Sequence, residues 1–125
     1  MKLQNDFFRI TSQTETDGKP VFDIRLNAEH EIFRAHFPDN PIVPGVCQVQ
    51  MLAECMETFT GSTLYLRSVK NIKYVALLTP RETTELQIVV QRLIKGDDSI
   101  AVTASLQTAD VQFSKISLTL QYQMA

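Results

Sequence analysis

The sequence predicts an α+β domain in which an antiparallel sheet wraps around one long helix. Three observations predict this class: two strand-like segments precede a single helical segment, about four strand-like segments follow it, and the helical segment is apolar nearly all round. A helix of that kind is buried on most of its sides. With 125 residues, the chain is long enough for one core and too short for two, so residues 1–125 are expected to form a single domain.

Two strands are expected before the helix, at residues 7–14 and 21–27. Apolar and polar residues alternate in the second of them, as they do in a strand with one buried face. Gly18 lies between the two strands and tolerates the positive φ of a tight turn. Residues 29–34 are expected to form a short helix or a turn. Prolines make the following loop, residues 37–44, stiff and unsuited to a central strand.

The one strong helix is expected between Pro44 and Gly61, because proline suits a first helical turn and glycine suits the left-handed residue that ends a helix. Cys47 and Cys55 lie on this helix, eight residues and so roughly 12 Å apart. That distance is too long for a disulfide, and both thiols are expected to be reduced and buried. The apolar residues at helical spacing are Val46, Val49, Leu52, Ala53, Met56 and Phe59.

About four antiparallel strands are expected after the helix, forming a sheet with one solvent-exposed face. A hairpin turn at residues 95–98 joins two of them. Phe113 is out of step with the alternation of the last strand, which predicts a bulge or turn near Ser114. The expected strands lie within residues 64–78, 85–94, 100–106 and 116–122.

Composition excludes several classes of function. A net charge of −2 gives no global attraction to nucleic acid or to an anionic membrane. No apolar run approaches the roughly 20 residues of a membrane helix, and the first residues lack the apolar stretch of a signal peptide. The sequence shows no metal-ligand spacing, phosphate-binding loop or serine–histidine–acid set. We therefore expect a cytoplasmic protein with no nucleic-acid, membrane or metal partner.

The most informative segment is HFPDNPIVPGV, residues 36–46, directly before the helix. It resembles the HFPxxPxxPGV signature of the β-hydroxyacyl-ACP dehydratases of fatty-acid synthesis, a family that includes the 3-hydroxymyristoyl-ACP dehydratases. The expected order of strands and helix agrees with that family over nearly the full length. The resemblance implies a hotdog fold, an antiparallel sheet around one central helix. It also implies elimination of water from a (3R)-3-hydroxyacyl thioester without any cofactor.

This elimination explains the residue types of the segment. A base must remove a weakly acidic proton at C2, an acid must protonate the leaving hydroxyl at C3, and preorganised donors must hold an enolate-like oxygen. The resemblance assigns His36 as the base. It assigns the backbone N–H groups of Gly45 and Val46, at the positive end of the helix, to the thioester oxygen. Glycine lets the substrate approach the main chain. Phe37 and Pro44 complete the expected substrate contacts.

The chain departs from the family at Gln50, where the resembling proteins have a carboxylic acid. Glutamine has no titratable proton, and loss of a general acid typically forfeits about 10²–10⁴ in rate. The family commonly has E-x-x-x-Q here, whereas this chain has Gln50 and Glu54 in the exchanged order, at i and i+4 on one helix face. One hypothesis is that Glu54 supplies the proton, directly or through water or Gln50. The alternative is a structural contact of Glu54 with a neighbouring strand or subunit.

The resemblance also implies partners. The substrate is a thioester of acyl carrier protein or of coenzyme A, and the assembly is a homodimer with an apolar acyl tunnel beside each helix, or a trimer of such dimers. One alternative is a catalytically weak acyl-binding subunit that forms a heterodimer with an active homologue. A thioesterase is a further alternative, which the histidine–proline signature disfavours. His30 is expected to be structural or exposed, and Glu57 is expected to be structural. Basic residues form either a rim for the acidic carrier or a solvated face: Arg34, Arg67, Lys70 and Lys73.

Overall fold

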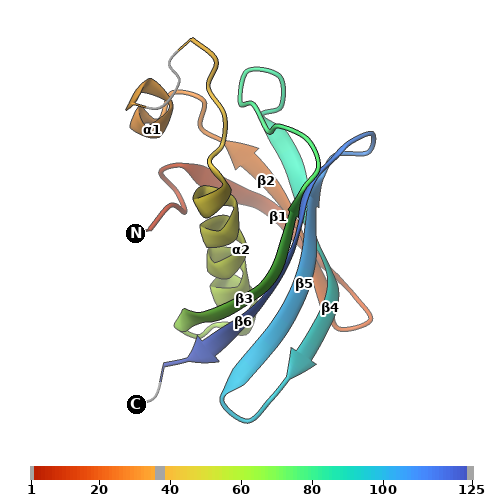
Figure 1. Ribbon diagram of the computed structural model, residues 1–125. Coiled ribbons are helices and arrows are strands. Elements are labelled where there is room, and N and C mark those ends of the chain that lie inside the picture. Colours follow the sequence, from red (N-terminus) through yellow and green to blue (C-terminus); the bar gives the residue numbers. More distant parts are fainter. Residues whose placement is uncertain (1, 36–38, 124–125) are drawn as a thin grey trace.

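The computed structural model describes residues 2–35 and 39–123 and contains one six-stranded sheet curled around a long helix (Figure 1). The strand order is β1-β2-β4-β5-β6-β3, and every neighbouring pair is antiparallel. The predicted α+β class is therefore confirmed. The elements are β1 (Phe8–Thr16), β2 (Lys19–Leu26), α1 (Glu31–Ala35), α2 (Gly45–Thr60), β3 (Leu64–Tyr74), β4 (Glu85–Lys95), β5 (Ser99–Gln107) and β6 (Gln112–Tyr122).

The elements before α2 follow the predictions closely. Asp17 and Gly18 have φ of 53° and 77°, so they form the tight turn expected between β1 and β2. Strand β2 begins two residues earlier than predicted, because Lys19 pairs with Thr16 directly after that turn. Residues 29–34, expected to be either a short helix or a turn, contain most of the helix α1.

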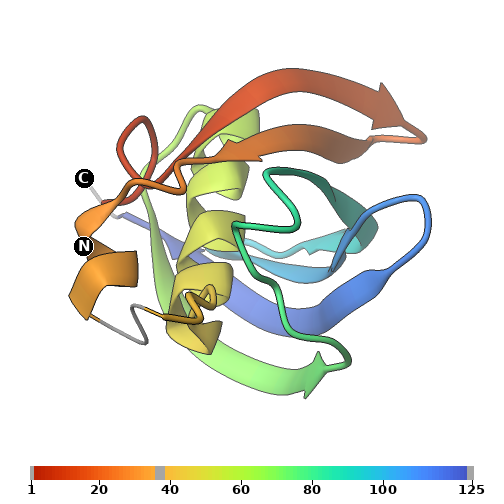
Figure 2. The same cartoon turned by 90° about the horizontal axis from the view of Figure 1, so that it is seen from above.

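Helix α2 has both predicted ends. Gly61 has φ of 69° and its N–H donates to the carbonyl oxygen of Glu57, a left-handed cap. The expectation that Val46 belongs to the buried apolar face is wrong, because its side chain is 67% exposed. Periodicity locates the apolar face of a helix, but it does not report how much of the helix the sheet covers. The sheet encloses α2 between the β1–β2 hairpin on one side and β3 on the other (Figure 2).

The bulge predicted near Ser114 is confirmed. Leu106 pairs with Ser114 and Gln107 with Gln112, so Phe113 is the extra residue in β6. Phe113 and Ser114 are both buried, although they are neighbours in a strand. The Ser114 hydroxyl donates to Oε1 of Gln48 on α2 over 2.7 Å. The bulge therefore turns a polar side chain inward, toward the first turns of the helix.

Strand β3 ends at Tyr74, earlier than the predicted segment. The N–H groups of Val75 and Ala76 both donate to the carbonyl oxygen of Phe113, which draws the chain over β6. The N–H of Val43 donates to the carbonyl oxygen of Leu78 over 2.8 Å. The segment after β3 is thus tied to the loop that leads into α2.

Both cysteines are buried and free, as predicted. Burial raises the pKa of the Cys47 thiol and of the Cys55 thiol, and the carboxylate of Glu54 adds to the effect at Cys55. Within residues 2–35 and 39–123, the helices are too short or too polar to cross a membrane.

Candidate active site

The start of α2 leaves two main-chain donors ahead of the first helical hydrogen bonds. The carbonyl oxygen of Pro44 accepts from the N–H of Cys47 over 3.0 Å and of Gln48 over 3.1 Å. The N–H groups of Gly45 and Val46 precede these bonds, and no acceptor among the described residues lies within hydrogen-bond reach of them. They are orphan donors of a first helical turn, where the helix dipole adds positive potential.

Gln48 fixes this helix start, although sequence reasoning did not select it. Its side chain is 3% exposed, and its Nε2 donates to the carbonyl oxygen of Val43 over 3.3 Å while its Oε1 accepts from Ser114. One buried amide thus joins the proline loop, the helix and the bulge of β6. The signal for it in the sequence is a polar residue within the apolar stretch of the predicted helix.

A pocket of about 180 Å³ lies at the start of α2. It contains Pro44 and Gly45, two of the predicted substrate contacts, together with mainly apolar side chains from the proline loop and from the segment after β3. These include Ile42, Leu77 and Leu78. Two larger hollows, of about 560 and 440 Å³, are lined by β1, β2 and their neighbours and contain none of the predicted site residues. The smaller pocket is therefore the candidate binding site, because it contains predicted site residues.

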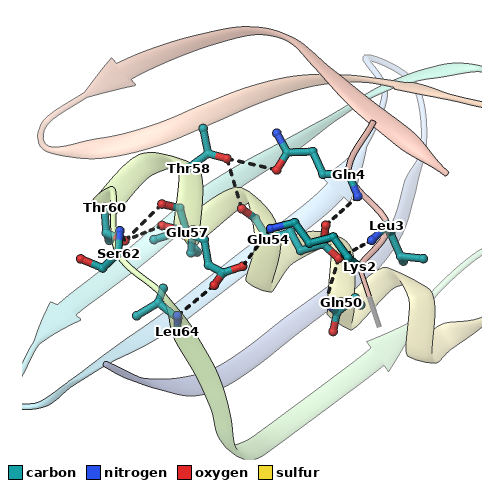
Figure 3. Close-up of polar contacts among 11 residues, drawn as sticks. Lys2, Leu3, Gln4, Gln50, Glu54, Glu57, Thr58, Thr60, Ser62 and Leu64 are labelled. Carbon is teal, nitrogen blue, oxygen red and sulfur yellow. Dashed lines mark hydrogen bonds and ion pairs between the residues drawn. The ribbon is translucent and has the colours of Figure 1, made fainter. Parts of the chain in front are cut away.

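Gln50 and Glu54 lie together, as their i, i+4 spacing predicts, and Figure 3 shows their contacts. Glu54 is 1% exposed. Its Oε2 accepts from the N–H of Leu3 over 2.7 Å and from Nε2 of Gln50 over 2.8 Å, and its Oε1 accepts from the N–H of Gln4 over 2.6 Å. All three partners are donors, so each bond uses a lone pair of the carboxyl group. The carboxylate fastens the N-terminal segment to the helix and holds the Gln50 amide.

The predicted site residues fall into two groups within one subunit. The pocket at the helix start contains Pro44 and Gly45 but neither Gln50 nor Glu54. Gln50 follows Gly45 by five residues, which on a helix means about 7.5 Å along the axis and about 140° around it. The Val46 side chain is exposed and does not line this pocket. His36 and Phe37 lie outside the described residues.

The secondary candidates have structural contacts. Nδ1 of His30 accepts from the N–H of Ile32 over 3.1 Å, which leaves Nε2, 3.1 Å from Oδ2 of Asp6, as the donor. Glu57 accepts from the N–H of Leu64 over 3.0 Å.

The basic side chains on β3 are exposed, and the Arg67 guanidinium lies 3.9 Å from Oδ1 of Asp98. Arg67, Lys70 and Lys73 are not among the residues that line the pocket at the helix start.

A sheet curled around one helix, with free donors and an apolar pocket at the helix start, is the architecture expected of a hotdog dehydratase. The family model described as ApeI-like, ApeI dehydratase, matches residues 12–116. The chain belongs to this family, and its function is dehydratase-like.

Curated relatives and solved structures agree with this family. A 3-hydroxyacyl-[acyl-carrier-protein] dehydratase FabZ of Wolbachia pipientis wMel is 36% identical over 112 residues, which cover 83% of this chain and 78% of the relative. An uncharacterised protein from Erwinia carotovora subsp. atroseptica superposes with a TM-score of 0.64 at 22% identity, covering 91% of this chain and 93% of that chain. The dehydratase heterocomplex ApeI:P from Xenorhabdus doucetiae superposes with a TM-score of 0.64 at 16% sequence identity, covering 90% of this chain and 96% of that chain. The predicted hotdog fold is thereby confirmed.

Proposed function

We propose that this chain is a subunit of a 3-hydroxyacyl-thioester dehydratase that acts on acyl carrier protein conjugates. The observation that carries the proposal is the start of α2, where the N–H groups of Gly45 and Val46 have no protein acceptor among the described residues and Gly45 lines an apolar pocket. These donors suit a thioester oxygen that gains charge during the reaction. The FabZ relative is named for this substrate class.

In the proposed reaction, His36 removes the C2 proton of the substrate and the C3–O bond then breaks. The hydroxyl leaves as water once it gains a proton, and the enoyl thioester remains. Carbon changes no net oxidation state, so no redox cofactor takes part. The apolar pocket receives the substrate next to the thioester, with Phe37 and Pro44 as further contacts.

The source of the second proton is the open step. The prediction that Glu54 supplies it stays a prediction, and the contacts of Glu54 favour a positioning role. Its carboxylate accepts the Gln50 amide and two main-chain N–H groups, so it orients Gln50 at the position of the family's acid. Gln50 then contributes hydrogen bonds rather than a titratable proton, and turnover is slow.

Product analysis tests the proposal. The purified chain is incubated with a (3R)-3-hydroxyacyl thioester of acyl carrier protein, and in parallel with the coenzyme A thioester. We expect the enoyl thioester as the product, with the carrier thioester bond intact. Release of free acid and thiol would instead identify a thioesterase and contradict the proposal.

We further propose that a second subunit completes the site. Gln50 lies about 7.5 Å along the helix axis from Gly45 and does not line the pocket at the helix start, which supports a site shared between two subunits. Strand β3 lies at the edge of the sheet, and large apolar side chains on it are about half exposed, among them Tyr65, Leu66 and Val69. A second copy of the chain that pairs along β3 would cover them and form a homodimer. Sedimentation velocity of the purified chain measures its oligomeric state.

A second candidate function is a weak subunit that depends on a homologue for the acid. It is favoured by Gln50 at the acid position and by the engagement of Glu54 with three donors. A structural neighbour is described as a dehydratase heterocomplex. In this case the chain alone is inert, and dehydratase activity appears on mixing with a hotdog homologue that has a carboxylic acid at the Gln50 position. Equal turnover with and without that homologue contradicts the candidate.

A further inference from the structure

Tyr74, at the end of β3, covers the glycine that opens α2. A Cβ built on Gly45 would lie 2.7 Å from Cζ of Tyr74 and closer still to its hydroxyl oxygen. Real Cβ atoms do not approach other atoms so closely. A side chain at position 45 would therefore displace the Tyr74 ring of the same subunit. The expectation that Gly45 serves substrate approach gives only part of the reason for a glycine there.

The same contacts that fix the helix start also fix Tyr74. Tyr74 pairs with Ser114 across the β3–β6 ladder, and Ser114 donates to the buried Gln48 side chain on α2. The next residue, Val75, donates its N–H to Phe113 over 2.8 Å. The backbone of Tyr74 is consequently held by β6, and its ring lies against Gly45 in the first turn of α2.

The Tyr74 hydroxyl is a free donor in a pocket that offers few others. The pocket at the helix start is mainly apolar, and both polar ends of Gln48, its other polar side chain, are engaged with Val43 and Ser114. Among the described residues, no hydrogen-bond partner lies within reach of the Tyr74 hydroxyl. Burial raises the pKa of Tyr74, so the phenol keeps its proton at neutral pH and can donate. The residue is still 52% exposed, so a ligand can reach it.

We propose that Tyr74 contacts the substrate, its hydroxyl donating a hydrogen bond to the thioester carbonyl oxygen alongside the N–H groups of Gly45 and Val46. This inference rests on the proposed function, because it assumes that an acyl thioester binds at the start of α2. Three fixed donors then converge on the oxygen that gains charge as the C2 proton leaves. A donor of this kind stabilises the enolate-like state more than the bound substrate, so it raises kcat more than it lowers KM.

The test removes the hydroxyl and keeps the ring. Tyr74→Phe preserves the contact with Gly45, and removal of one such donor lowers kcat by about 10² with a small change in KM. The matched control is Tyr122→Phe at the far end of β6, eight residues and about 26 Å from Ser114. Unchanged kcat in Tyr74→Phe, or an equal loss in both variants, overturns the proposal.

A binding measurement separates this proposal from the proposed reaction. Butanoyl-pantetheine with a 13C-labelled carbonyl has no 3-hydroxyl group and cannot eliminate water. We expect its infrared carbonyl band to move to lower wavenumber on binding to the native chain and to Tyr122→Phe, and to move less with Tyr74→Phe. Equal carbonyl wavenumbers in the three proteins, or an unshifted carbonyl band with the native chain, refute the role of Tyr74. A shift that depends on Tyr74 in a chain that forms no enoyl product supports that role and contradicts the dehydration.

Discussion

Replacing Glu54 with glutamine tests whether this carboxylate is a structural anchor. The substitution preserves the size of the side chain but exchanges one acceptor oxygen for an NH2 group. Three N–H donors meet the two oxygens of Glu54, from Leu3, Gln4 and Gln50. In either orientation of the new amide, at least one of these donors therefore faces another donor.

The expected loss of stability follows from these contacts. A buried donor left without an acceptor costs about 1–3 kcal/mol, and the remaining bonds weaken because hydrogen bonds to a charged acceptor are about twice as strong as neutral ones. We expect Glu54→Gln to lower the free energy of unfolding by about 2–4 kcal/mol. That is a large part of the roughly 5–15 kcal/mol of an ordinary domain.

Urea unfolding and amide hydrogen exchange measure the effect. The matched control is Glu57→Gln, one turn along the helix, where the carboxyl group accepts from one main-chain N–H, that of Leu64, and forms a long ion pair of 3.8 Å with the exposed Lys2. An amide oxygen can keep that bond, so the free energy of unfolding of the control should fall by less than about 1 kcal/mol. In Glu54→Gln, the amides of Leu3 and Gln4 should also exchange faster. Equal destabilisation in the two variants, with unchanged exchange at residues 3 and 4, would refute the anchoring role.

Two other predictions follow from the helix start and the core. Gly45→Ala should displace the Tyr74 ring, so a double-mutant cycle with Tyr74→Ala should give a coupling of about 0.5–3 kcal/mol in urea unfolding, and additive effects would contradict this contact. Cys47 and Cys55 should resist iodoacetamide at pH 8 in the native protein and react in urea, because burial raises both thiol pKa values. Their neutral thiols stabilise the fold fully at pH values below 9.0, the ordinary pKa of a thiol. This contribution is lost as the pH rises from that value through the raised pKa values of the folded state. Rapid labelling of the folded chain would contradict their burial.

Local patterns in the sequence predicted much of the fold. Pro44 and Gly61 mark the ends of α2, because each has a backbone preference that suits one end of a helix. The broken alternation at Phe113 located the bulge of β6, because side chains in a strand change face at every residue. These features depend on residues that are close in sequence.

The contacts that shape the candidate site join distant residues, and the sequence did not predict them. Glu54 accepts from Leu3, which is 51 residues away, so no local pattern reports this bond. Tyr74 meets Gly45 only because β6 places the end of β3 beside the helix start. The exposure of Val46 likewise depends on how far the sheet extends.

The rate of enoyl formation by Gln50→Glu, relative to the native chain, tests the central claim most directly. The claim is that this chain has a dehydratase site whose acid position is occupied by an amide. Restoring a carboxylic acid there should raise the rate by about 10²–10⁴, the usual contribution of a general acid. A variant that remains folded despite losing the Gln50–Glu54 hydrogen bond, yet forms the enoyl thioester no faster than the native chain, would contradict the claim.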